Sequence, residues 1–145
     1  MKLVNWIPHT LTTEHVRELK KAQGEHELSR ICFHQNTSCD LHIMLISCAA
    51  NVKYPMHKHD NTGEWYLIFD GELTLQQLAD PTGTPDTITL SSRSESKNNG
   101  RIMGHLVSEN IWHSTEAGNE GAIFLEVRRG PFARESTSFF EESGS

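Results

Sequence analysis

The sequence has few cysteines, and none of them is spaced as in a metal or redox motif. The three, Cys32, Cys39 and Cys48, form an odd set without a CxxC pair among 145 residues. Such a set fits neither a disulfide-stabilised secreted domain nor a zinc knuckle. Cys48 ends an apolar run, which favours a place in the core over a catalytic role. We therefore expect a reduced, cytoplasmic protein.

Long apolar runs and a surplus of basic residues are also missing. No stretch approaches the ~18 apolar residues that a membrane span needs, and the first residues do not resemble a cleavable signal sequence. The 13 Lys and Arg residues against 19 Asp and Glu residues give a formal net charge of −6. Surfaces that bind nucleic acid or anionic membranes are usually basic. We expect neither of these partners, and a small-molecule substrate instead.

Histidine, in contrast, is abundant. The chain contains nine histidines, whereas its 36% hydrophobic and 22% charged residues are ordinary for a globular protein. The length fits one domain. Because imidazole is the commonest metal ligand in proteins, the histidine surplus directs attention to clusters with metal-ligand spacing.

The first 30 residues predict an extended arm followed by one helix. Thr12 or Thr13 is suited to the N-cap, and Glu14 to the positively polarised first turn. Gly24 is a natural end of the helix. We therefore expect a short N-terminal helix packed on the rest of the domain.

After the helix, short strand-like runs follow one another, separated by turn residues. They are residues 31–33, 41–48, 65–69, 73–78, 87–90, 101–107 and 122–127. The pair Asp70-Gly71 predicts a hairpin turn between two of them. Many short strands without intervening helices indicate an all-β sandwich or barrel. We expect a barrel over residues 31–132, after the arm and helix (1–30) and before a C-terminal tail (133–145).

The most informative pattern is a pair of histidines followed by a glutamate. His57 and His59 are two residues apart, so on a strand both imidazoles point to the same face. Glu64 opens the next apolar run after a short turn segment, and His113 precedes a later β-like run. Three nitrogen ligands and one oxygen ligand that converge from strands form a divalent-metal site.

The same residues resemble a known family. The spacing His57-x-His59-x4-Glu64-x6-Gly71 matches the first motif of the cupin superfamily, and His113 falls where the second motif supplies its last ligand. Together with residues 30–34, 41–47, 112–113 and 124–132, the pattern is similar to the WbuC family of small cupin metalloproteins, over residues 28–142. The resemblance implies a single cupin-type β-barrel (jelly roll) with a metal at its mouth. It also implies a link by gene neighbourhood to bacterial surface-polysaccharide synthesis, but no established reaction.

The second motif departs from the cupin pattern. Ser108 and Asn110 stand near the positions of the usual Pro-x-Gly, and Ala117 stands where an asparagine is expected. Asn110 can adopt the left-handed conformation that glycine normally supplies. All four ligand types are retained, so metal binding is still expected.

The sequence alone also allows roles other than metal binding for these four residues. His57 and His59, on either side of Lys58, also fit a solvent-facing strand. Glu64 also fits a surface carboxylate on an edge strand, and His113 a histidine that caps a loop. The remaining histidines outside this set and His34 are expected to be structural or solvated: His9, His15, His26, His42 and His105.

Five further residues are candidates for contact with a substrate. Alternation in the last strand places Glu126 and Arg128 on one face. If this face lines the cavity, Glu126 is a candidate acid or base and Arg128 an anion clamp; otherwise they form a solvent-facing ion pair. Tyr54 supplies a hydroxyl at the mouth or only packs there, and His34 lines the cavity or lies at its rim. Trp112 is a candidate substrate contact within the second motif.

These ligands leave several metals and functions open. One divalent ion of Fe, Mn, Ni or Zn suits the set. The first hypothesis is a metal-dependent isomerase, epimerase or lyase acting on a sugar-like or keto-acid substrate, with Glu126 moving a proton. The alternatives are an Fe(II) dioxygenase and a non-catalytic small-molecule-binding module. We also expect a homodimer, because cupins often pair through their sheets and the arm with Trp6 and Ile7 could add to a neighbour's edge strand.

Overall fold

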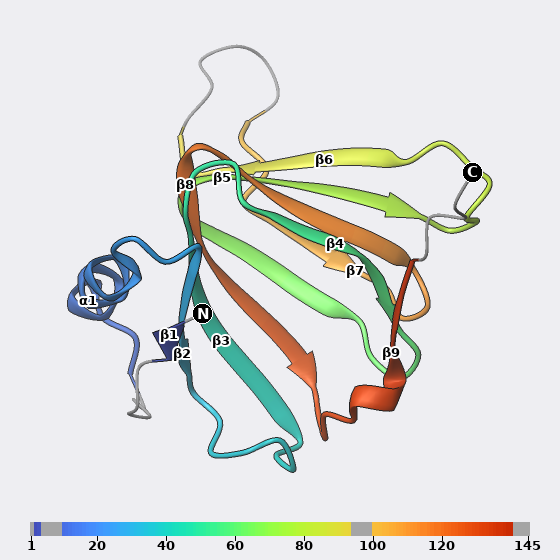
Figure 1. Ribbon diagram of the computed structural model, residues 1–145, viewed down its shortest axis with the longest axis horizontal. Helices are drawn as coiled ribbons and strands as arrows, with labels where there is room; N and C mark the ends of the chain where they lie inside the picture. Colours follow the sequence, from blue (N-terminus) through green and yellow to red (C-terminus); the bar gives the residue numbers. More distant parts are fainter. Residues whose placement is uncertain (1, 4–9, 94–99, 141–145) are drawn as a thin grey trace.

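The computed structural model describes residues 2–3, 10–93 and 100–140, so the predicted contact of Trp6 and Ile7 with a neighbour lies outside the described residues. Strands account for most of the described chain, and there is one α-helix (Figure 1). The elements are β1 (Lys2–Leu3), α1 (Thr13–Gln23), β2 (Leu28–Cys32), β3 (Leu41–Cys48), β4 (Lys53–His59), β5 (Glu64–Leu78), β6 (Asp86–Ser91), β7 (Gly104–Val107), β8 (Trp112–Arg129), the 3₁₀ turn η1 (Arg134–Ser136) and β9 (Thr137–Phe139). Within the described residues, no helix has the length and apolar character needed to cross a membrane.

The predicted helix is confirmed, with Thr12 as its N-cap. The Thr12 hydroxyl accepts a hydrogen bond from the backbone N–H of His15, and the His15 ring accepts one from the Thr12 N–H. Both bonds satisfy donors that the first helical turn leaves free. Leu19 is fully buried and packs with Ile31 and Leu45 on the outer side of the sheet. The helix therefore covers one outer face, as Figure 1 shows beside β2 and β3.

The barrel is organised around β8. This strand pairs with β3 and β4 along one edge and with β5 along the other, and all three pairings are antiparallel. Strands β6 and β7 pair with β5, and the short β1 adds parallel to β2 at the other end. Strands far apart in sequence therefore meet in one sheet that curves around a common interior (Figure 1).

The hairpin turn predicted at Asp70-Gly71 is wrong. β5 continues through these residues, and only its register with β8 shifts there. Gly71 has a φ of 73°, and a Cβ on it would lie 2.1 Å from the carbonyl oxygen of Gly121, which has a φ of 81°. Glycine with positive φ occurs in β-bulges of the G1 type as well as in tight hairpin turns, so the Asp-Gly pair fits both.

The segment expected as a C-terminal tail contains ordered structure in its first part. η1 and β9 follow the barrel, and β9 pairs antiparallel with β4. The register places Phe139 opposite His57 and Thr137 opposite His59. This short strand therefore lies beside the predicted metal ligands.

Strand alternation decides which side chains face the interior. On β8, Phe124 belongs to the inner core cluster, whereas Ile123 packs with the helix cluster on the outer side. Glu126 and Arg128 share the parity of Phe124 and therefore face the interior. Cys48 is buried in the inner cluster, as expected.

Candidate metal centre

The four predicted ligands come together at one end of the barrel. His57 and His59 end β4, Glu64 begins β5, and His113 lies at the start of β8 directly opposite His57. All four side chains are buried, and one ligand atom from each lies within 4.8 Å of the others. In the preceding turn, Asn110 has a φ of 62° and hydrogen-bonds to the His59 carbonyl, so it does adopt the left-handed conformation. Strand pairing thus places the four side chains around one point.

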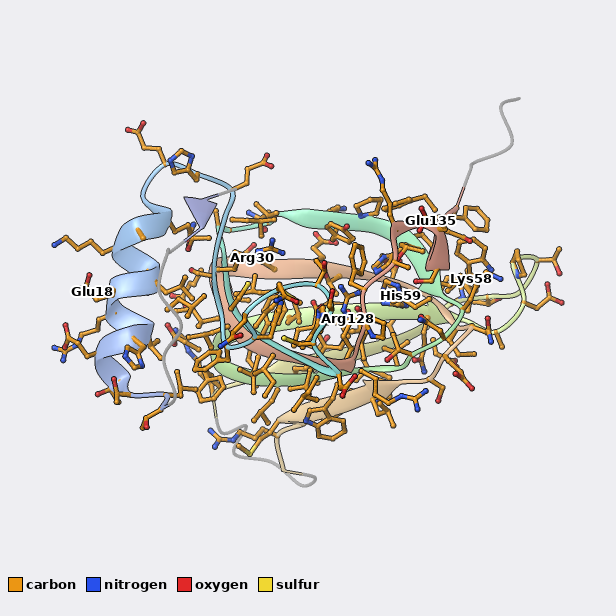
Figure 2. All side chains as sticks on the ribbon, turned by 90° about the horizontal axis from the view of Figure 1, so that it is seen from below. Glu18, Arg30, Lys58, His59, Arg128 and Glu135 are labelled. Carbon is orange, nitrogen blue, oxygen red and sulfur yellow. The ribbon has the colours of Figure 1, made fainter. Side chains whose placement is uncertain are left out.

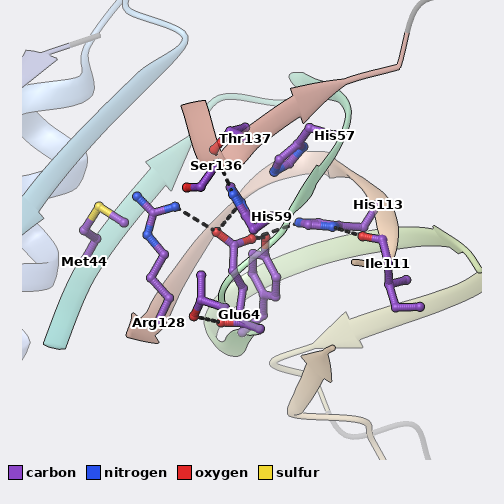
Figure 3. A network of polar contacts seen from close by, with 12 residues as sticks. Met44, His57, His59, Glu64, Ile111, His113, Arg128, Ser136 and Thr137 are labelled. Carbon is purple, nitrogen blue, oxygen red and sulfur yellow. Dashed lines mark hydrogen bonds and ion pairs between the residues drawn. The ribbon is translucent and has the colours of Figure 1, made fainter. Parts of the chain in front are cut away.

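The carboxylate of Glu64 lies at the centre of this cluster (Figure 3). Its Oε1 lies 2.9 Å from Nε2 of His59, and its Oε2 lies 2.9 Å from Nε2 of His113. The Tyr66 hydroxyl donates a hydrogen bond of 2.6 Å to Oε2, and Arg128 donates a longer one of 3.4 Å to Oε1. Glu64 is thus a buried carboxylate surrounded by nitrogen and hydroxyl groups.

Each histidine is oriented through its other ring nitrogen. Nδ1 of His57 lies 2.9 Å from the carbonyl oxygen of Pro55, and Nδ1 of His113 lies 2.9 Å from that of Ile111. A carbonyl only accepts, so both Nδ1 atoms carry a proton, and the Nε2 atoms are on the opposite side of each ring from these carbonyls. Nδ1 of His59 lies 2.9 Å from the hydroxyl of Thr137 on β9. Partners of this kind fix the ring orientation of metal-binding histidines in general.

The protonation states also suit a cation. Burial, followed by the neighbouring His113, lowers the pKa of His57 to about 4. Burial alone would raise the pKa of Glu64, but the His113 and His59 rings in contact with it hold the pKa well below its usual range. At neutral pH the cluster therefore presents a neutral His57 and an ionised Glu64, the forms that bind metals.

The donor set of this chain fits a divalent ion. Nε2 of His59 is buried without a hydrogen bond of good geometry, although Oε1 of Glu64 is 2.9 Å away. A buried ring nitrogen without a hydrogen-bond partner is costly unless another group fills the site. The residues that could hold the ion are His57, His59, Glu64 and His113.

Sequence reasoning missed two residues that hold this cluster. Tyr66 hydrogen-bonds to Glu64, and its position two residues further along the same strand is a signal that could have identified it. Thr137 contacts His59 across 78 residues of sequence. No local pattern indicates that contact, because it depends on where β9 returns to the barrel.

Glu126 lies on the interior face next to the cluster. Its register partners are Met44 on β3 and Tyr66 on β5. Burial and then the negative charge of Glu64 raise the pKa of Glu126 well above its usual range. The pKa values of these two neighbouring carboxyl groups are therefore shifted in opposite directions.

The remaining predicted substrate residues lie in different places. The Tyr54 ring is 44% exposed and packs edge-on against His57, with ring centroids 4.9 Å apart. His34 lies after β2 and stacks on the buried His42 at 4.1 Å. Trp112 contacts Phe140 and lies under the Lys58 ammonium group at 5.1 Å, so its described contacts do not include the four clustered residues.

Two described cavities lie away from these residues. Each has a volume of about 290 Å³. One lies between the end of α1 and the turn after β3, and the other lies around Gly71 and Gly118. Neither is lined by any of the four clustered residues, so the candidate site rests on side-chain chemistry and not on cavity size.

Comparison with known proteins gives a match only at the level of structure. No protein-family model matches the sequence, and no curated protein matches it significantly. Oxalate decarboxylase from Bacillus subtilis is similar with a TM-score of 0.56 and 21% identity, over 71% of this chain and 24% of that one. CapF in complex with the inhibitor 3-isopropenyl-tropolone has a TM-score of 0.63 and 13% identity, over 79% of this chain and 32% of that one.

A further similar structure is the formate complex of oxalate decarboxylase from Lactobacillus farciminis. It has a TM-score of 0.54 and 21% identity, over 72% of this chain and 28% of that one. The present chain therefore spans about a quarter to a third of the length of these proteins. At such low identity the likeness concerns the fold: the chain has the cupin fold, as its motif predicted.

Proposed function

We propose that this protein is a cupin metalloenzyme that holds one divalent ion through His57, His59, Glu64 and His113. The observation that carries the proposal is the convergence of four buried ligand atoms within 4.8 Å of one another. The outward contacts of the three Nδ1 atoms support it, because they fix the ring orientations with Nε2 on the opposite side of each ring. Manganese is among the candidate ions, because Mn(II) centres are named for one similar structure, that of Bacillus subtilis oxalate decarboxylase. Iron, nickel and zinc also suit this ligand set.

The reaction we propose is of the isomerase, epimerase or lyase type on a small polar substrate, sugar-like or a keto acid. A divalent ion in this site would act as a Lewis acid on a carbonyl or hydroxyl oxygen of the substrate. Glu126 is the proposed proton carrier, because it faces the interior and its pKa is raised well above its usual range. Tyr66 and Arg128 keep the Glu64 carboxylate in place by donating hydrogen bonds to it. Among the similar structures, a decarboxylase of a small acid is an example of the lyase class.

Three of the proposed substrate contacts are placed near the metal cluster and Glu126. Arg128 is buried beside Glu64, and Tyr54 packs against His57 at the exposed end of the cluster. The charge of Arg128 also acts on His34. Trp112 is the weakest candidate, because its contacts are with Lys58 and Phe140.

The finer assignments are proposed from the sequence. They are membership of the WbuC-like group, a place in surface-polysaccharide synthesis, a cytoplasmic location and assembly as a homodimer. The sequence at residues 30–34, 41–47, 112–113 and 124–132 supports the first of these. Measurement of the molar mass in solution tests the last.

The metal proposal is tested by elemental analysis of the purified protein and of His57→Ala and His113→Ala. We expect about one equivalent of a transition metal in the wild type and a sharp loss in both variants. His26→Ala is the matched control, because His26 is exposed on the segment after α1. Full metal content in both ligand variants would contradict the proposal. The role of Glu126 is tested with Glu126→Gln. This variant should lose metal-dependent turnover while its metal content stays the same.

A further inference from the structure

Arg30 is a second arginine on the interior face of the barrel. On β2 its neighbours Ser29 and Ile31 face the helix, where the Ser29 hydroxyl bonds to the Leu19 carbonyl. Alternation therefore turns Arg30 to the opposite side, toward the interior. Figure 2 shows Arg30 and Arg128 toward the middle of the barrel, whereas Glu18 points outward from α1.

Within the described residues, the guanidinium of Arg30 forms no salt bridge. Its Nη1 contacts the Met44 sulfur at 3.7 Å, which is a weak acceptor. Its Nε is buried without any hydrogen-bond partner. Among residues 10–93 and 100–140, no carboxylate lies within salt-bridge distance of it. A buried guanidinium donor left unpaired costs free energy that a bound anion would recover.

Arg128 is the other cation on this face, and it is only partly satisfied. Its side chain is 12% exposed, with Nη1 3.4 Å from Glu64 and the guanidinium 4.6 Å from the centre of the Phe132 ring. The Glu64 carboxylate already has contacts at 2.6–2.9 Å with His59, His113 and Tyr66. The planar fork of Arg128 therefore has donors left for another acceptor.

The two arginines share one interior space. Both guanidinium charges act on the same three groups, His34, Tyr54 and Glu126. Figure 3 shows Arg128 between Glu64 and Met44, and Met44 is the residue that Arg30 contacts. Arg30 and Arg128 thus approach the region beside the metal cluster from β2 and β8.

With a metal bound, the interior beside the cluster carries a net positive charge. A divalent ion with Arg30 and Arg128 outweighs Glu64 and Glu126 by two charges even when both carboxylates are ionised. A ligand that enters the region is therefore attracted if it is an anion. Because two carboxylates also face the region, a singly charged carboxylate suits it better than a doubly charged phosphate.

We propose that Arg30 and Arg128 together bind the carboxylate of the substrate, which makes the substrate class a small organic acid and not a neutral sugar. The inference rests on the proposed function, since it takes the metal cluster as the reacting end of the site. Arg30 would be the residue that selects for the acid, because it forms no salt bridge within the described residues and its Nε has no hydrogen-bond partner.

The test measures pyruvate binding by calorimetry, on metal-loaded and metal-free protein, with pyruvamide as the neutral analogue and inorganic phosphate as the competing anion. We expect pyruvate to bind and pyruvamide to bind at least about tenfold more weakly. Arg30→Gln should weaken pyruvate binding about tenfold or more, with less effect for Arg30→Lys. Arg17→Gln, an exposed arginine on α1, is the matched control and should leave binding unchanged.

Three outcomes would overturn the inference. They are equal binding of pyruvate and pyruvamide, unchanged pyruvate affinity in Arg30→Gln, and phosphate binding tighter than pyruvate binding. The comparison of pyruvate with pyruvamide needs only the wild type, so it is decisive even if a variant fails to fold. Metal content measured on the same samples separates the metal proposal from the carboxylate proposal. Arg30→Gln should keep its metal. Metal-free protein should still bind pyruvate more tightly than pyruvamide, and this preference should depend on Arg30.

Discussion

At the scale of single residues, the candidate metal centre depends on the groups that hold its ligands. Each of the three imidazoles has its Nδ1 fixed by a different partner, and only Thr137 among these partners is a side chain. The first motif predicts His57, His59 and Glu64, because their spacing is local to two strands and one turn. His113 is predicted by a second motif, 49 residues after Glu64. Neither motif predicts Thr137, because that contact is made by a strand 78 residues away.

Replacement of Thr137 by valine should weaken metal binding. Valine keeps the shape but removes the hydroxyl that orients His59, and loss of such a partner lowers metal affinity about 10- to 100-fold. Metal affinity measured by chelator competition checks this, with Thr137→Ser as the control that retains the hydroxyl. Equal affinity in the wild type and Thr137→Val would show that His59 does not need this contact.

His34 should make stability depend on pH. Burial and then the neighbouring His42 lower the pKa of His34 below its ordinary value of 6.5, and Arg30 and Arg128 act in the same direction. The folded state thus resists a proton that the unfolded chain accepts, so stability falls as the pH drops below 6.5. Urea unfolding at about pH 7.5 and about pH 5.5 should show a smaller loss in His34→Gln than in the wild type. An identical loss in both proteins would remove His34 as a cause.

At the scale of elements, local patterns predicted the elements but not all of their limits. The helix and the run at residues 41–48 agree with α1 and β3, because capping residues and an apolar run determine them locally. β5 is longer than predicted, because an Asp-Gly pair fits a bulge as well as a turn. Only the pairing with β8 decides between the two.

The bulge predicts a large difference between two glycine substitutions. Gly71→Ala should lower the free energy of unfolding by about 2–5 kcal/mol, because its Cβ meets the Gly121 carbonyl and its φ is positive. Gly100→Ala is the control, since Gly100 has a φ of 66° but no atom within 4 Å of the added Cβ. Only the backbone cost of about 1 kcal/mol applies there. Equal losses in urea unfolding would mean that β5 bends enough to relieve the contact.

At the scale of the whole molecule, the candidate site joins strands that come from distant parts of the chain. β4, β5 and β8 supply the four ligands, and β9 supplies the contact to His59. A metal ion would therefore link these strands in the folded state only. Sequence reasoning predicted the cupin fold and the ligands, but the role of Arg30 depends on how β2 closes the interior.

Removal of the metal should lower the thermal stability of the whole domain. A ligand that binds only the folded state stabilises it by about 4 kcal/mol at a thousandfold excess over its dissociation constant. A chelator should therefore lower the melting temperature by several degrees, and added divalent metal should restore it. His113→Ala should melt at the same temperature with or without the chelator. A wild-type melting temperature that does not respond to the chelator would contradict a resident metal.

The pairing of β8 with β3, β4 and β5 has a consequence for synthesis on the ribosome. His57, His59 and Glu64 leave the ribosome before His113, which follows Glu64 by 49 residues, and before Thr137, which follows His59 by 78. A nascent chain that ends before β8 has only three ligands and no central strand to close the barrel. The site is therefore completed late in translation, and metal capture should coincide with the final closure of the barrel around β8.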